Sequence, residues 1–294
     1  MRRAPRVAAV TMVRNEGRML RKWVDHYAGQ LGADHLVVID DSSDDGSTDD
    51  LGCKVERIKP ITDHFELARM RIVSEVAAKL LRKHDAVVFA DADEFIVPDP
   101  ARFDGLRDFV AAHADEAAVG VLGLNVVHHL AGEGPLTFDR PFLDQRRLAK
   151  FIPLLCKPSV KLTKKPWAAA SHGVRGASFS VSPDLYMFHM KFADRGHLQR
   201  TAEHRRAMVE MDGRADASSW QFTGDEMVAL LDRINDGVGT DVSALREFAP
   251  PRAKLAEIVR TFDNGVTRAT GNRQVAAMER RPLLRIPERF RRLV

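Results

Sequence analysis

The chain has 294 residues, a formal net charge of +4, 45% hydrophobic residues and 29% charged residues. This composition is typical of a globular protein and excludes a chain that is disordered throughout. No apolar run approaches the roughly 18 residues of a membrane-spanning helix, so no such helix is predicted. The two cysteines, Cys53 and Cys156, belong to no C-x-x-C pair, which disfavours a zinc or redox motif and favours free thiols in a reducing cytoplasm.

The positive charge is concentrated at the C-terminal end. From Arg273 onward the sequence holds seven arginines and two glutamates, so the rest of the chain is close to neutral. A nucleic-acid-binding protein usually carries a basic stripe on its folded body, whereas this body carries clustered aspartates, and no nucleic-acid partner is expected. The tail could lie on an anionic membrane surface or be a solvated end. Its interspersed apolar residues are Leu283, Leu284, Ile286, Phe290 and Leu293.

The first 130 residues alternate between two hydrophobic periodicities. Short apolar runs rich in β-branched residues predict buried strands at 7–13, 35–39, 55–58, 86–90 and 119–127. Amphipathic stretches between them predict helices at 18–30, 65–82 and 101–113. Strands that alternate with helices over this length predict an α/β domain built on a parallel sheet.

The pattern changes after residue 128. Residues 131–183 contain many Gly, Pro and Ser residues, which predicts loops and short irregular strands. A strand is predicted at 185–192, and helices at about 194–211 and 224–235. The tail from Arg273 is predicted to be basic and partly helical.

Polar clusters follow three of the predicted strands. They are Arg14-Asn15-Glu16, Asp40-Asp41 and Asp91-Ala92-Asp93. In open α/β sheets ligands bind at the carboxyl ends of the strands, so these clusters are expected to meet. Carboxylates that project together without a local Lys or Arg partner predict a divalent cation, and hard oxygen ligands with substrate phosphates suit Mg²⁺ or Mn²⁺.

Competing motifs are absent from the sequence or incomplete. The stretch from Asp41 to Gly46 resembles the start of a calcium loop, but its twelfth position is Gly52 where a bidentate Glu is needed. The sequence has no Walker lysine motif, no G-x-G-x-x-G after the first strand and no G-x-S-x-G elbow. These observations disfavour an EF-hand, a nucleotide P-loop, a dinucleotide site and a serine hydrolase.

Three motifs in order carry a family resemblance: V-R-N-E after the first strand, V-I-D-D-S-S-D-D-G-S-T-D after the second, and F-A-D-A-D-E-F. Together they resemble family 2 glycosyltransferases of the GT-A fold, in particular a bacterial subgroup with a D-x-D-E-F motif. The segments C-K-P-S-V-K and L-Y-M-F-H-M-K resemble later parts of the same subgroup. The resemblance implies a Rossmann-like mixed sheet flanked by helices. It also implies a nucleotide-sugar-binding half at 1–130, a loop-rich acceptor half at 131–235, and a helical, basic C-terminal extension at 236–294.

The resemblance also implies roles for the strand-end residues. The Asn15-Glu16 turn, with Asp40 or Asp41, would hold the nucleotide base and ribose. Asp91 and Asp93 match the D-x-D pair, and Asp93 is the expected direct metal ligand while Asp91 lies nearer the ribose.

A later histidine often completes the metal site in such enzymes. His189 is the chosen candidate because Lys191, two residues on, shares its strand face and could face the donor phosphate. Packing within a strand is the alternative for His189, and His172 in S-H-G-V-R-G is then the substitute ligand.

The general base is less clearly marked. An inverting transfer needs a carboxylate to take the proton of the acceptor hydroxyl. Asp194, just beyond H-M-K-F-A, has the relative position expected from the resemblance, and Glu94 is the alternative. Glu94 could equally brace the metal ligands.

The resemblance implies a metal-dependent transfer of a sugar from a nucleotide-diphosphate donor, a UDP- or GDP-sugar, to an acceptor hydroxyl with inversion. A glycan or lipid-linked acceptor and a role in cell-envelope or polysaccharide synthesis are expected. The expected location is the cytoplasm, with peripheral contact at the inner face of the membrane through the basic tail. Two alternatives remain open: a sugar-nucleotidyltransferase, and a nucleotide-sugar-binding protein that has lost turnover.

Overall fold

Four parallel strands form the N-terminal part of the sheet. The computed structural model describes residues 3–62, 64–212 and 219–294. The strand order in this part is β3–β2–β1–β4, and Val10 of β1 pairs with Val37 of β2 on one side and Phe89 of β4 on the other. The strands are β1 (Val7–Val13), β2 (Leu36–Asp40), β3 (Lys54–Arg57) and β4 (Ala86–Phe89).

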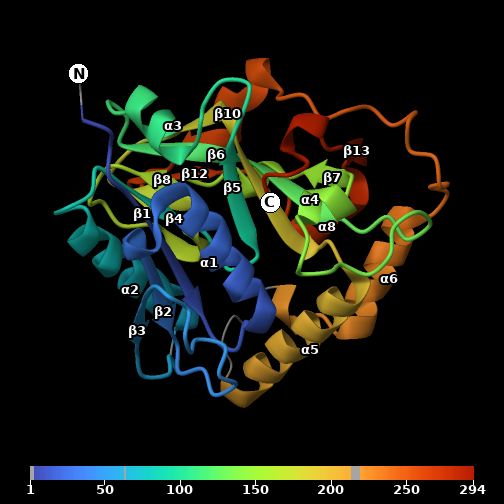
Figure 1. Cartoon of the computed structure of the whole chain (residues 1–294), viewed down its shortest axis with the longest axis horizontal. Helices are drawn as coiled ribbons and strands as arrows, with labels where there is room; N and C mark the ends of the chain where they lie inside the picture. The colour runs from blue at the N-terminus through green and yellow to red at the C-terminus, as the bar shows by residue number, and fades with distance from the viewer. Residues whose placement is uncertain (1–2, 63, 213–218) are drawn as a thin grey trace.

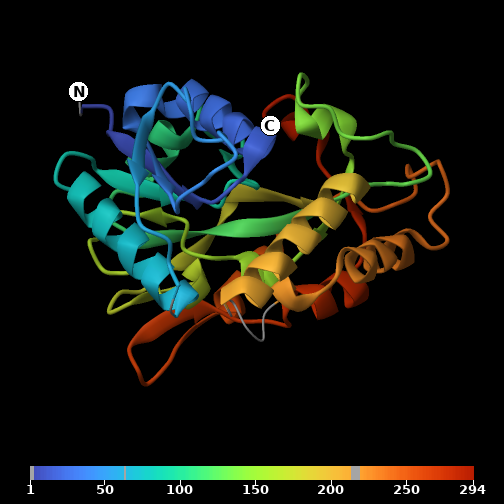
Figure 2. The same ribbon diagram turned by 90° about the horizontal axis from the view of Figure 1, so that it is seen from below.

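Helices cover both faces of these strands, as Figures 1 and 2 show. Alternate residues of β1 serve the two faces: Val7 and Ala9 pack in the cluster that contains helices α1 and α3, while Ala8 and Val10 pack against α2. This strict alternation follows from the two-residue period of a strand. The helices are α1 (Gly17–Leu31), α2 (Phe65–Leu80) and α3 (Leu106–Ala112).

The sheet continues with mixed strand directions. In the described part of the chain it has ten strands, and its long central partner β10 runs parallel to β6 and antiparallel to β5. The expectation of an α/β fold with a mixed sheet flanked by helices is therefore confirmed, although the alternation alone had predicted a parallel sheet. The further strands are β5 (Glu94–Pro98), β6 (Ala118–Val127), β7 (Leu148–Phe151), β8 (Val160–Lys161), β10 (Ser180–Phe192) and β13 (Leu284–Arg285).

The remaining elements flank this sheet. A small antiparallel sheet has the order β11–β12–β9, and helices α5 and α6 pack against each other near the carboxyl-terminal end of β10 (Figure 1). The strands of this small sheet are β9 (Gly173–Arg175), β11 (Val259–Thr261) and β12 (Val266–Ala269). The further helices are α4 (Phe142–Gln145), α5 (Arg195–Asp212), α6 (Gly224–Asn235), α7 (Leu255–Ile258) and α8 (Gln274–Arg280).

The C-terminal region differs from the expected helical extension. Between residues 236 and 294 the two α-helices, α7 and α8, are short, and three strands belong to the two sheets. The apolar side chains of the tail are mostly buried, since Phe290 is 0% and Leu284 is 5% exposed. Most of the tail's apolar side chains therefore pack into the protein core, whereas Leu293 is 40% exposed.

Two further expectations can be compared with the structure. None of the helices in the described ranges is long and apolar enough to cross a bilayer. Cys53 and Cys156 are both free thiols, as predicted from their spacing.

Candidate functional site

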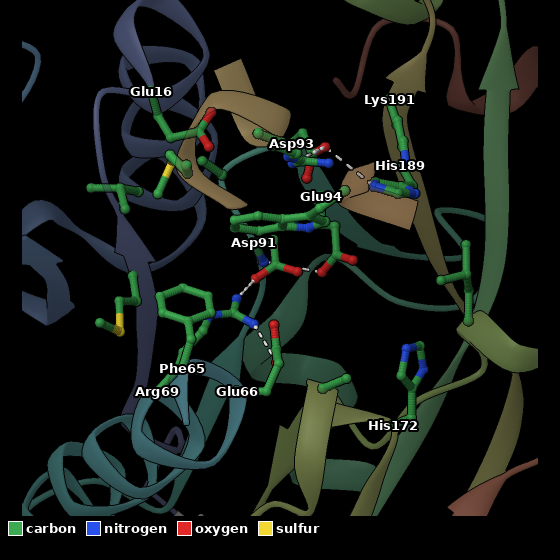
Figure 3. Close-up of a pocket in the computed structure, with 18 of the residues that line it drawn as sticks. Glu16, Phe65, Glu66, Arg69, Asp91, Asp93, Glu94, His172, His189 and Lys191 are labelled. Atoms are coloured by element: carbon green, nitrogen blue, oxygen red, sulfur yellow. Dashed lines mark hydrogen bonds and ion pairs between the residues drawn. The ribbon is translucent and has the colours of Figure 1, made fainter. Parts of the chain in front are cut away.

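A pocket of about 710 Å³ opens at the carboxyl ends of β1, β2 and β4. The three strand ends are adjacent, because the backbone N–H of Asp41 donates to the carbonyl of Val13 at 2.8 Å and that of Ala90 donates to Val10 at 3.3 Å. Figure 3 shows side chains from α2, the β4–β5 turn and β10 converging on this space. The sequence-predicted residues that line it are Glu16, Asp41, Asp91, Asp93, Glu94, His172, His189 and Lys191.

The D-A-D-E segment forms a tight turn between β4 and β5. The backbone N–H of Glu94 donates to the carbonyl of Asp91 at 2.9 Å, and the Glu94 carboxylate accepts from the backbone N–H of Asp91 at 3.0 Å. Strand β5 then pairs antiparallel with β10, with Glu94 opposite His189. This pairing brings His189, from the part of the chain after residue 130, directly beside the aspartates.

Asp93 and His189 form the central pair of the site. Nε2 of His189 lies 3.2 Å from Oδ2 of Asp93, and both side chains are nearly buried. Burial opposes ionisation of Asp93, but His189 and Arg205 outweigh it and hold the pKa of this carboxyl well below its usual range. Asp93 is therefore an anion in the folded protein.

Asp91 is held by two cations from distant parts of the chain. Arg69 of α2 contacts Oδ1, and Nζ of Lys157 lies 3.6 Å from Oδ2. The strand-end carboxylates have no local Lys or Arg partner in the sequence, and tertiary contacts supply the partners of Asp91. Although burial opposes it, the charges of Arg69 and Lys157 lower the pKa of Asp91.

Lys157 also neutralises Glu94 beneath the pocket. Its ammonium lies 2.7 Å from Oε1 of Glu94 and donates to Oγ of Ser171 at 3.2 Å, and only 3% of the residue is exposed. Burial alone would lower the pKa of Lys157, but the two carboxylates raise it. Glu94 is thus engaged as a brace of the turn.

Three basic side chains, Arg69, Lys191 and Arg205, lie against the aspartates and are called the basic wall. Arg205 of α5 places its guanidinium 3.8 Å from Asp93 and over the ring of Trp220 in the short helix η4 (Ser219–Gln221), 5.5 Å from its centroid. Burial, with Arg205 nearby, lowers the pKa of Lys191 to about 7. Burial, with Lys157 nearby, lowers the pKa of His172 to about 3, so its ring is neutral.

Three of these cations were missed by sequence reasoning. Arg69 lies in the middle of a helix and Arg205 in another, where exposed arginines are common and give no signal. Lys157 lies in the C-K-P-S-V-K segment, which carries part of the family resemblance, and that segment is the signal that could have pointed to it.

The predicted base- and ribose-binding residues separate into two groups. Glu16 and Asp41 line the pocket, whereas Asn15 and Asp40 are absent from its described lining. Asn15 joins the turns after β1 and β2 through two hydrogen bonds with Asp44, at 2.9 and 3.0 Å. Asp40 is buried and accepts from the backbone N–H of Ser43 at 2.7 Å. Asn15 and Asp40 therefore both have structural roles.

Glu16 is a pocket carboxyl with a raised pKa. Burial raises its pKa to about 7, an effect that Arg205 partly offsets and that Asp93 and Asp91 reinforce. The carboxyl therefore changes charge close to neutral pH.

Asp194 is absent from the described lining of the pocket. Its carboxylate accepts from the backbone N–H of His197 in the first turn of α5 at 2.8 Å, as an N-cap does, and from that of Leu136 at 2.8 Å. The buried guanidinium of Arg146 lies 3.6 Å away. This arrangement gives Asp194 a structural role outside the described lining of the pocket.

The Asp93–His189 pair fits one edge of a cation site. In the described part of the chain no group of three or more His, Cys, Asp or Glu side chains forms a complete metal cage. Mg²⁺ and similar ions commonly take only one or two protein ligands and complete their shell with phosphate oxygens and water. Two ligands at about 2.1 Å from an octahedral ion are about 3 Å apart, which is close to the Asp93–His189 separation.

Comparisons with known proteins add no family assignment. The chain matches no protein-family model, and no curated protein matches it significantly.

Proposed function

We propose that this chain is a glycosyltransferase that moves a sugar from a nucleoside-diphosphate donor to an acceptor hydroxyl. The observation that carries the proposal is the Asp93–His189 pair, with 3.2 Å between Oδ2 and Nε2, near the carboxyl ends of the parallel strands β1, β2 and β4 and opposite a basic wall. The D-x-D-E-F resemblance supports a GT-A architecture for this sheet.

The basic wall suits the diphosphate of such a donor. Arg205 and Arg69 lie beside the aspartates and Lys191 projects from the same strand as His189 (Figure 3). Charge-assisted hydrogen bonds from guanidinium groups favour phosphate oxygens. These side chains would bind the diphosphate in the ground state and stabilise the charge that grows on it as the sugar leaves.

Asp93 and His189 are the residues that would hold a divalent cation. Bound there, Mn²⁺ or Mg²⁺ would supply Lewis-acid stabilisation of the departing diphosphate. Asp91, neutralised by Arg69 and Lys157, would serve the ribose side of the donor, which agrees with the role that the resemblance implies.

Glu16 is our candidate for the general base. All carboxyl groups in the described lining come from residues 16–94, and Glu94 is engaged by Lys157. A pKa of about 7 suits a group that accepts a proton near neutral pH. Glu16→Gln should lose transfer and keep metal-dependent nucleotide binding.

A nucleotide-sugar-binding protein without turnover is the second candidate. It is favoured by the structural engagement of both Asp194 and Glu94, the two acids first expected to act as the base. Donor binding without hydrolysis or transfer would select this candidate.

Thermal melting tests the proposal. The wild type is heated with UDP, GDP, CDP or dTDP, with and without Mn²⁺, because a ligand that binds only the native state raises the melting temperature. We expect one nucleotide to stabilise the protein only with metal, and Asp93→Ala to abolish this effect. Asp25→Asn, an exposed change on α1, is the matched control and should leave the shift intact. No shift with any nucleotide would overturn the proposal.

A further inference from the structure

A buried amide lies behind the site in an otherwise apolar strand. Asn125 belongs to β6, whose sequence is AVGVLGLNVV, and it is 0% exposed. Burying an amide is unfavourable unless its polar atoms are hydrogen-bonded. The hydrogen-bond partners of this buried amide therefore indicate its role.

Asn125 is the direct partner of His189. The two residues are paired in the parallel register of β6 and β10, and Nδ1 of His189 lies 2.6 Å from Oδ1 of Asn125. Because this oxygen can only accept, the proton of the bond lies on Nδ1 of the ring. Nε2, the other ring nitrogen, is the one that faces Asp93.

Met278 of α8 determines which way the amide points. Nδ2 of Asn125 donates to Sδ of Met278 at 3.1 Å. A thioether sulfur has no proton to donate, so it can face only the NH₂ end of the amide. The carbonyl end is thereby turned toward His189.

Met278 is itself held firmly in place. It is 0% exposed, and its backbone carbonyl accepts from Nζ of the buried Lys150 at 2.6 Å. Lys150 of β7 is paired with Asn125 of β6 in the sheet. A short helix of the C-terminal region is thus tied to the strand that supports the site.

We infer that Asn125, oriented by Met278, is a positioning residue that keeps Nδ1 of His189 protonated and directs Nε2 toward Asp93, so that Nε2 is the nitrogen offered to a cation. The inference rests on the proposed function, in which His189 binds the cation. Histidine ligands generally donate their second ring N–H to a neighbouring acceptor, and loss of that acceptor lowers metal affinity about 10- to 100-fold.

Nitrogen NMR of the metal-free wild type tests the position of this proton, with the signal of His189 assigned by its loss in His189→Gln. At pH 8 we expect Nδ1 to be protonated, whether or not Nε2 also carries a proton toward the Asp93 carboxylate. A bare Nδ1 would overturn the inference, whether or not the protein binds metal.

Mn²⁺ binding, measured by the loss of the free-ion signal in electron paramagnetic resonance, tests the effect on affinity. Asn125→Leu has similar volume and no acceptor, so we expect about 10- to 100-fold weaker binding. Asn125→Asp keeps an acceptor and should restore binding close to the wild-type level. Met278→Leu should give an intermediate loss, because the amide is then free to turn.

Asn235→Leu is the matched control for general damage. Asn235 is a partly buried amide that bonds the backbone of His128 and Leu130 and is absent from the described pocket lining. It should lower the melting temperature and leave Mn²⁺ affinity unchanged. Wild-type affinity in a folded Asn125→Leu would overturn the inference, whereas absence of Mn²⁺ binding by the wild type would overturn the metal site of the proposed function.

Discussion

The two halves of the chain contribute opposite charges to the same pocket. The carboxyl groups of the described lining all belong to the N-terminal half: Glu16, Asp41, Glu66, Asp91, Asp93 and Glu94. Most of the cations and histidines come from the other half: Lys157, His172, His189, Lys191, His204, Arg205 and Arg273. The site is therefore an acidic strand edge closed by a basic wall.

This difference explains why one half of the site was easier to find than the other. Apart from Glu66 in α2, the acids lie at or just after strand ends, where local sequence places them on one edge of the sheet. The cations lie within helices, a loop and strand β10, and only the packing of those elements brings them to the acids. Compensation across the two halves lets several carboxylates be buried together, because buried charges persist only when they are paired.

Removal of Lys157 should have the largest effect on the charge compensation between the buried carboxylates and cations. Lys157→Met leaves Glu94 and Asp91 without their shared buried cation, and breaking such a pair costs about 3–5 kcal/mol of unfolding free energy. Urea unfolding measures this loss. The double variant Lys157→Met/Glu94→Gln should recover part of it, and equal stability of the single and double variants would contradict the pairing.

Asp194 is a carboxylate with a structural role, and it lies away from the basic wall. Asp194→Ala removes the cap of α5 and a partner of Arg146, so we expect a loss of about 1–3 kcal/mol in unfolding free energy. Metal-dependent nucleotide binding, followed by melting shifts, should persist. Loss of sugar transfer in a variant of normal stability would instead indicate that Asp194 is the general base.

Arg205 tests the basic wall itself. Arg205→Gln should weaken metal-dependent nucleotide binding about tenfold, since one charge-assisted hydrogen bond contributes about 1.5–3 kcal/mol. Calorimetric titration with the nucleotide identified by melting gives the affinity. The neighbouring Arg206→Gln is the control, because Arg206 pairs with Glu210 at 2.8 Å on the exposed side of α5. Equal losses of nucleotide affinity in both variants would show that the affinity depends only on the net charge of the protein.

Glu16 should give the smallest and most pH-dependent effect. Its pKa is about 7 in the folded chain against 4.5 for the ordinary side chain, so the folded state holds the proton more tightly. Stability conferred by the protonated group is present below about pH 4.5 and declines as the pH rises through 7. Glu16→Gln cannot ionise, and its melting temperature should therefore exceed that of the wild type by a few degrees at pH 8 and by less at pH 5. A difference independent of pH would contradict the raised pKa.

Much of the N-terminal half could be predicted from periodicity. The first strand, predicted at 7–13, matches β1, and the helix predicted at 65–82 matches α2 to within two residues. Strand β5 was not predicted, because Glu94–Pro98 follows the D-A-D turn without a break and reads as part of the motif. The C-terminal strands were missed for a related reason: β11, β12 and β13 are two to four residues long and leave no periodic signal.

The sequence by itself determined the positions of the acids. Hydrophobic alternation defines β1, β2 and β4, and polar residues directly after a strand must lie at its carboxyl end. Tertiary structure alone decided which side chains neutralise them. His189 reaches Asp93 because β10 pairs with β5, Asn125 reaches His189 because β10 also pairs with β6, and Arg205 approaches only where α5 docks. These contacts join residues at least 64 positions apart, and no local pattern encodes a pairing over that distance.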